Sequence, residues 1–276
     1  MFQAVKDLPA LRRWYYTHNA PVPLSRYKAD LSQAITQNRR TLALVTHWLD
    51  DAVYQASIFQ YGLQPHIRAV LDQPIDDSPT YSDLIVHLAR EMGALRYLEL
   101  GPSVGKNLFQ VAKAVHGAAI VAVDIEDINP ILEQQLSFRE MESWPTAPGS
   151  KRKALSTRKS YALDDNSIDY IAGDLFDPAT WERLRGRSFN LIFSDAFHSP
   201  EALAMEWDYI CRLELLTTDR FAMVWDDLST PGMRAAFYQI AGDIRRRRPA
   251  AVISLELFAG WVGRSERLHP IGIIRG

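Results

Sequence analysis

Carboxylates stand where several apolar, strand-like runs of this sequence stop. Residues 97–100, 118–123, 189–194 and 221–225 are such runs, and the acidic residues at or just after their ends are Glu99, Asp124, Asp195, Asp226 and Asp227. Parallel strands bring their carboxyl ends to one edge of a sheet, and α/β sheets bind ligands in the crevice at that edge. Carboxylates there can accept hydrogen bonds, hold a hard cation or exchange a proton. The pattern therefore predicts a polar site at the carboxyl edge of a parallel sheet.

The segment 96–115, RYLELGPSVGKNLFQVAKAV, supplies the turn at the centre of this site. Residues 97–100 are apolar enough for a buried parallel strand, and from Lys106 onward apolar residues recur with helical spacing. Gly101 and Gly105 lie between the two elements, where a sharp turn lets a ligand approach the backbone. The first amides of the following helix are free to bind that ligand. This strand, turn and helix predict a cofactor site.

The spacing of the glycines excludes two phosphate-binding loops. A dinucleotide fingerprint needs G-x-G-x-x-G, whereas Gly101 and Gly105 are four positions apart. A P-loop needs four residues between its glycines and then Lys-Ser/Thr, whereas here three residues separate them and Asn107 follows Lys106. Residues 99–105, ELGPSVG, instead resemble motif I, E/D-x-G-x-x-x-G, of the class I S-adenosylmethionine-dependent methyltransferases.

This resemblance covers the chain from about residue 94 to the C-terminus and implies the fold. An α/β, Rossmann-like domain is expected over residues 91–276, with a sheet of seven strands whose seventh strand is antiparallel. Residues 1–90 show no strand pattern and predict an N-terminal helical extension, with helices at 37–61, 65–71 and 82–92. Residues 139–166 are polar and locally basic, which favours a solvated surface excursion; a mobile flap and a site for an acidic substrate are the alternatives.

The resemblance also implies S-adenosylmethionine as the cofactor. In the family, the acidic residue at the tip of the second strand accepts hydrogen bonds from the ribose hydroxyls, which corresponds to Asp124, with Glu126 able to share the role. A G-D-x sequence after the third strand lies at the adenine and corresponds to Asp174 and Leu175. The predicted cofactor-binding residues are Glu99, Gly101, Pro102, Ser103, Gly105, Asp124, Ile125, Asp174, Leu175 and Asp195.

Three acidic residues at neighbouring strand tips predict either a metal site or a metal-free polar site. Asp195, Asp226 and Asp227 resemble the ligand set of metal-dependent small-molecule O-methyltransferases, which would hold Mg²⁺ beside the sulfonium. The alternatives are that they bind a substrate amine or cap the next helix. Residues 195–201, DAFHSPE, are similar to the D-G-D-H-S-Y-E segment of the branch that acts on natural products.

Catalysis is assigned to Asp195, His198, Tyr15 and Tyr16. Histidine titrates near neutrality, so His198 is the candidate general base for the accepting atom, and a helix-capping role is the alternative. If a metal lowers the pKa of the acceptor, the histidine becomes secondary. The N-terminal aromatics either pack the extension onto the sheet or form a lid over the substrate, and Tyr15, Tyr16 and Tyr27 are the lid candidates.

We therefore expect a methyltransferase that O-methylates a small molecule in secondary metabolism. Two alternatives stay open: a ring-forming enzyme that displaces methylthioadenosine from the same cofactor, and a non-catalytic cofactor-binding module. The net charge of -2 and the absence of an apolar run of about 18 residues argue against nucleic-acid and membrane partners. The single cysteine, Cys211, excludes an internal disulfide and favours the cytoplasm. A homodimer is compatible with these features.

Overall fold

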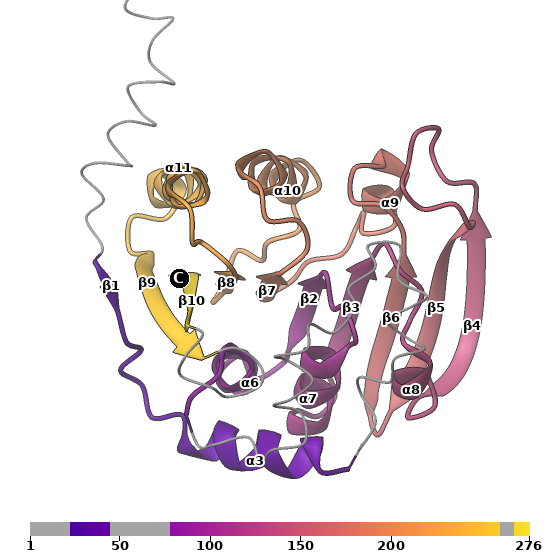
Figure 1. Ribbon diagram of the computed structural model, residues 1–276, viewed down its shortest axis with the longest axis horizontal. Coiled ribbons are helices and arrows are strands. Elements are labelled where there is room, and N and C mark those ends of the chain that lie inside the picture. The colour runs from indigo at the N-terminus through magenta and orange to yellow at the C-terminus, as the bar shows by residue number, and fades with distance from the viewer. Residues whose placement is uncertain (1–22, 45–77, 260–267) are drawn as a thin grey trace, which may run out of the picture.

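The computed structural model describes residues 23–44, 78–259 and 268–276. They form one mixed sheet of ten strands in the order β1-β9-β10-β8-β7-β2-β3-β6-β5-β4 (Figure 1). The strands are β1 (Leu24–Ser25), β2 (Arg96–Leu100), β3 (Ala119–Asp124), β4 (Ser137–Trp144), β5 (Ser156–Leu163), β6 (Asn166–Ala172), β7 (Leu191–Ser194), β8 (Ala222–Trp225), β9 (Val252–Ala259) and β10 (Leu268–Arg275).

Seven of these strands make the sheet that the sequence predicts. Strands β6, β3, β2, β7 and β8 are parallel neighbours, and β10 pairs antiparallel with both β8 and β9. Strand β9 therefore runs in the same direction as β8. The α/β, Rossmann-like fold with an antiparallel seventh strand is confirmed. The strand count is corrected from seven to ten, because β1 extends one edge and the β4–β5 hairpin extends the other.

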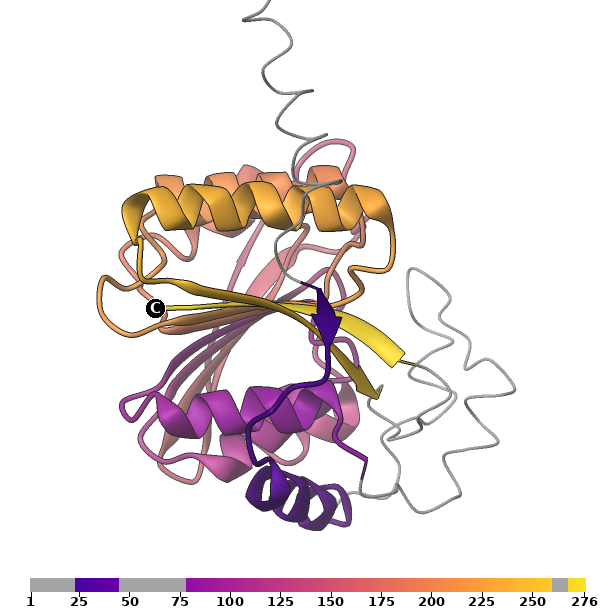
Figure 2. The same ribbon diagram turned by 90° about the vertical axis from the view of Figure 1, so that its left-hand side faces the viewer.

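Helices cover both faces of the sheet. The helices are α3 (Ser32–Leu42), α6 (Tyr81–Glu91), α7 (Lys106–Ala114), α8 (Pro130–Glu133), α9 (Pro178–Glu182), α10 (Pro200–Arg212) and α11 (Pro231–Arg247). Helices α3, α6, α7 and α8 lie on one face and α9, α10 and α11 on the other (Figures 1 and 2). Each face has its own apolar cluster, built around Leu84 and Leu108 on the first and Phe237 on the second, all with no exposed surface. Among the described residues, no helix has the length and apolar character that crossing a bilayer requires.

The segment 139–166, expected as a solvated surface excursion, forms most of a hairpin at the edge of the sheet. Strands β4 and β5 form a hairpin that pairs antiparallel with β6. The outer strand β4 is mostly exposed, whereas four of the eight residues of β5, including Tyr161 at 1% exposure, are buried. Since a sheet edge with solvent on both sides keeps little apolar alternation, the period of two that marks a strand is absent from the sequence.

The N-terminal region differs from its prediction in two ways. Helix α3 begins at Ser32 and ends at Leu42, so the helix predicted over residues 37–61 is confirmed at residues 37–42, but it begins five residues earlier than predicted and ends at Leu42 within the described residues. The rest of that helix and the one predicted over residues 65–71 lie outside the described residues. Strand β1, which no pattern predicted, pairs with β9 through Leu24 and Ser25. The helix predicted over residues 82–92 is confirmed as α6, whose Thr80 and Asp83 form a capping box.

Candidate functional site

Glu99 is a buried carboxyl at the carboxyl end of β2. Its side chain has no exposed surface, and among the described residues neither carboxyl oxygen has a hydrogen-bond partner of acceptable geometry. Burial raises the pKa of Glu99 to about 8, although the nearby Tyr97 hydroxyl and Asn107 side chain lower it in part. At neutral pH the group is therefore mostly protonated. A cation placed beside it would supply the missing partner and ionise it.

The glycine loop after β2 is shaped by its contact with the end of β7. Gly101 and Gly105 both have left-handed backbones, with φ of +78° and +79°. A Cβ added to Gly101 would lie 2.5 Å from Ala196 Cα and 2.6 Å from the Asp195 carbonyl oxygen. On the side where a Cβ would point, the atoms that approach Gly101 therefore belong to the loop after β7. Pro102 in the same loop is buried, and Ser103 is exposed.

Asp124, at the end of β3, joins this loop to the next strand. Its carboxylate accepts hydrogen bonds from the Ser103 amide at 2.9 Å and the Glu126 amide at 3.0 Å. Burial raises the pKa of Asp124 to about 6, and these amides offset part of the shift. Each oxygen receives one of these bonds, which leaves acceptor capacity for ligand hydroxyls. Ile125, the next residue, is half-buried, and its carbonyl accepts from Arg152 at 2.8 Å.

Asp174, predicted at the adenine, lies in contact with the loop between β4 and β5. Its carboxylate accepts from the Ser150 hydroxyl at 2.7 Å and from the Lys151 and Phe176 amides. Leu175 beside it is buried. Phe176 and Phe197 lie nearby as an exposed pair, with ring centroids 5.6 Å apart in an edge-on arrangement. A planar ring could therefore be held by apolar surface here, with the Asp174 carboxylate already engaged by the protein.

Asp195 and His198 lie together after β7, as the sequence predicts. His198 Nε2 is 3.4 Å from an Asp195 oxygen, and His198 Nδ1 is 3.6 Å from an Asp227 oxygen. The ring thus stands between two carboxylates and keeps 38% of its side-chain surface exposed. Burial and the neighbouring carboxyls of Asp226 and Glu99 raise the pKa of Asp195 well above its usual range. At the carboxyl edge of the sheet, an imidazole that can accept a proton therefore lies beside the Asp195 carboxyl, which favours its protonated form.

His269 is a site residue that the sequence analysis missed. Its Nδ1 is 3.2 Å from Asp226 Oδ1, and both side chains are largely buried. Its ring centroid lies 5.5 Å from that of Tyr81. A signal was present: His269 is near the start of the antiparallel strand β10, and such a strand begins at the edge where its parallel neighbours end. A polar residue at that position joins the carboxylates that follow β7 and β8.

The predicted metal site at Asp195, Asp226 and Asp227 is not supported. Within the described part of the chain, no group of three or more His, Cys, Asp or Glu is placed to hold a metal ion. The physical reason is that the acidic groups have other partners. Asp226 contacts His269 and also accepts from the Asp227 amide, while the carboxylate of Asp227 faces His198. Tyr15 and Tyr16, predicted as catalytic, lie outside the described residues.

No protein-family model and no curated protein matches the sequence. Among solved structures, the chain is similar to an O-methyltransferase from Bacillus cereus in complex with SAH, at 13% identity over 90% of this chain and 100% of that chain, with a TM-score of 0.46. It is also similar to the O-methyltransferase TomG from Streptomyces achromogenes, involved in tomaymycin synthesis, at 13% identity over 96% and 95% of the two chains, with a TM-score of 0.45.

A third similar structure is the N-methyltransferase NodS from Bradyrhizobium japonicum in complex with S-adenosyl-L-homocysteine, at 12% identity over 87% of this chain and 98% of that chain, with a TM-score of 0.43. These identities and TM-scores are low. The proposed function therefore rests on the site of this chain itself.

Proposed function

We propose that this protein transfers a methyl group from S-adenosylmethionine to an oxygen of a small molecule. The observation that carries the proposal is the state of Glu99: a fully buried carboxyl with no hydrogen-bond partner of acceptable geometry among the described residues, beside a left-handed glycine loop. S-Adenosylmethionine brings an ammonium and a sulfonium charge, and a buried carboxylate is stable only next to such a cation. The buried carboxyl at this edge of the sheet therefore fits a cofactor that carries positive charge.

We assign the different parts of the cofactor to different residues around Glu99. Asp124 keeps acceptor capacity for the two ribose hydroxyls while it holds the Ser103 amide. Ile125 and Leu175, from the ends of β3 and β6, offer apolar surface for the adenine. Asp174 acts indirectly, because its hydrogen bonds fix the Ser150 loop beside that surface. When bound, the cofactor supplies a methyl group that is electrophilic because it is attached to a sulfonium.

Two histidines are available to take the proton from the accepting hydroxyl. His198 lies between Asp195 and Asp227, and His269 contacts Asp226. His269 can donate from Nδ1 to Asp226, which leaves its Nε2 to accept a proton, whereas both ring nitrogens of His198 face carboxylates. In each case a carboxylate stabilises the imidazolium that forms. Positioning of the two reactants supplies much of the rate of an in-line displacement, and a base matters because a hydroxyl starts protonated. The natural-product type of segment at residues 195–201 supports an acceptor from secondary metabolism.

The experiment is a calorimetric titration with S-adenosylmethionine, followed by mass spectrometry of the nucleoside formed with candidate acceptors. Asp124→Asn is expected to weaken cofactor binding about 10- to 150-fold, the value of a hydrogen bond to a charged group. If His198 takes the proton, Asp195→Asn should lose turnover; in either case it should bind S-adenosylmethionine within about twofold of the unchanged protein. Asp208→Asn, on the exposed side of α10, is the matched control, since its side chain is 70% exposed.

Each outcome decides between the candidate functions. S-Adenosylhomocysteine as the product supports methyl transfer, whereas methylthioadenosine would identify the ring-forming alternative. Saturable binding without turnover of any acceptor would favour a binding module. Failure of the protein to bind S-adenosylmethionine would overturn the proposal.

A further inference from the structure

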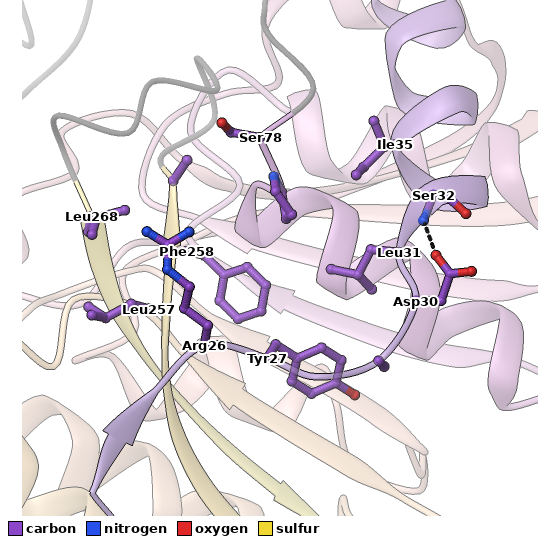
Figure 3. A pocket seen from close by; sticks show the side chains of 13 residues that line it. Arg26, Tyr27, Asp30, Leu31, Ser32, Ile35, Ser78, Leu257, Phe258 and Leu268 are labelled. Atoms are coloured by element: carbon purple, nitrogen blue, oxygen red, sulfur yellow. Dashed lines mark hydrogen bonds between the residues drawn. The ribbon is translucent and has the colours of Figure 1, made fainter.

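A cavity of about 310 Å³ lies between β9, the segment before α3 and the segment before α6. Its wall is mainly apolar, and Tyr27, Leu31 and Phe258 point toward one another across it (Figure 3). Arg26 and Asp30 contribute one charge of each sign, and both are exposed. The volume is at the small end of the range of about 300–1,000 Å³ found for ligand pockets. A compact, uncharged and largely apolar molecule fits this lining.

The cavity is at the same edge of the sheet as the candidate site. Strand β9 runs in the direction of β8, and the cavity is lined by its last residues, 257–259, and by Leu268 at the start of β10. The carboxyl ends of β8 and β7, followed by Asp226 and Asp195, lie on the same edge two and three strands away from β9. Ligands of open α/β sheets bind along this edge.

The register of β9 and β10 connects the cavity wall to the acidic residues. Phe258 and His269 are directly paired across the two antiparallel strands. Side chains at directly paired positions lie on the same face of a sheet, with Cβ atoms about 4.5–5.5 Å apart. His269 is therefore the neighbour of a cavity-lining ring on one side and contacts Asp226 at 3.2 Å on the other.

Aromatic contacts link the side chains at this wall of the cavity. The Tyr27 ring packs on Phe258 with centroids 5.8 Å apart, and its hydroxyl accepts from Arg275 at 3.1 Å. Tyr81, which follows the cavity-lining Pro79 by two residues, packs against His269 with the ring planes tilted by 51°. These contacts fix the positions of the aromatic rings that line and adjoin this wall.

We propose that this cavity binds the body of the methyl acceptor, an uncharged and mainly apolar hydroxyl compound of one or two rings, and that His269, oriented by Asp226, receives the hydroxyl proton. The inference rests on the proposed function. The step is balanced: the acceptor oxygen forms a bond to the methyl carbon as the carbon–sulfur bond breaks, and the hydroxyl proton moves to His269 Nε2. The neutral thioether S-adenosylhomocysteine leaves with the electron pair of the broken bond.

The test uses 4-fluorophenol as a probe, observed by fluorine NMR on the full chain. Saturable binding is expected. Ala29→Trp, which fills the cavity from an exposed lining position, should weaken it at least tenfold. Lys28→Trp is the matched control, because Lys28 is adjacent and exposed but does not line the cavity, and should change affinity less than twofold. Ile35→Phe fills the cavity from α3 and guards against a local effect at residue 29.

A second readout reports on His269. The protein has seven histidines, so the ring signal that disappears in His269→Gln identifies this residue. Saturation with 4-fluorophenol should shift that signal and leave the signal of the 85% exposed His116 in place. Equal binding to Ala29→Trp and the unchanged protein, no saturable binding, or an unmoved His269 signal would overturn the inference. Because S-adenosylmethionine binding is measured on the same variants, its absence would show failure of the proposed function instead.

Discussion

The protonation of Glu99 gives a quantitative prediction for cofactor binding. Burial raises the pKa of Glu99 to about 8, above its ordinary value of 4.5, so the free protein holds this proton at neutral pH. A cationic ligand needs the ionised carboxylate, and its apparent dissociation constant is the intrinsic constant divided by the ionised fraction. With a pKa of 8, that fraction is about 0.01 at pH 6.0 and about 0.24 at pH 7.5. Affinity for S-adenosylmethionine should therefore rise about 24-fold over this interval.

The Glu99→Gln variant distinguishes the titration of Glu99 from that of the other groups at the site. Asp124 has a pKa of about 6, so its ionisation adds about a factor of two over the same interval. Glu99→Gln keeps the shape but cannot ionise, and should leave only this factor of two. An α-amino group with a pKa of about 7.7–8.0 is still about 60–75% protonated at pH 7.5, so loss of the cofactor's own charge lowers the expected rise by less than a factor of two.

The assay is calorimetric titration at pH 6.0, 6.5, 7.0 and 7.5, in buffers with different heats of ionisation. The unchanged protein should release close to one proton per cofactor bound at pH 7, whereas Glu99→Gln should release far fewer. If the affinity of the two proteins follows the same pH dependence, Glu99 does not meet the cation and the reasoning from its burial is wrong. The variant should also be more stable without ligand at pH 7 by about 3 kcal/mol, because the raised pKa of the buried acid destabilises the fold as pH rises from 4.5 toward 8.

Three further changes test other parts of the site. Gly101→Ala should destabilise the fold by about 2–4 kcal/mol in urea, since its Cβ would lie 2.5 Å from backbone of the loop after β7. Gly93→Ala, at φ +69° with no atom within 4 Å, should cost only about 1 kcal/mol, and equal costs would refute the close-approach argument. His269→Gln should lower turnover at least about 100-fold with cofactor affinity within twofold; unchanged turnover would leave His198 as the base. Ser150→Ala should cost about 1 kcal/mol and weaken cofactor binding modestly through the freed Asp174 carboxylate, and an unchanged melting temperature would show that this bond is not stabilising.

The sequence predicts the central part of the sheet because each strand there is buried on both faces. Such strands are short apolar runs, and their ends are marked by acidic residues such as Asp124 and Asp195. The turn at Gly101 was also predictable, because a left-handed backbone favours glycine. The atoms that pack against it come from residues 195–196, and nothing local to the glycine shows that.

The remaining features depend on pairings between distant segments. The hairpin β4–β5 lies at an edge, where solvent removes the apolar period, and β1 is stabilised only by its two-residue pairing with β9. The partnership of Asp226 with His269 joins residues 43 positions apart. It also explains why acidic residues that resemble a metal ligand set face histidines instead. Composition gives no signal for such pairings.

The position of β10 has a consequence for how the protein folds during synthesis. Strand β10 lies between β8 and β9 in the sheet, although it follows both in the chain. During synthesis, β9 and β1 therefore cannot join the sheet until residues 268–275 have left the ribosome. The apolar residues of β9 are buried only when this long-range pairing forms. His269 arrives with the same strand. Closure of the sheet and completion of the Asp226–His269 pair are thus one event, and a nascent chain that stops before β10 has neither.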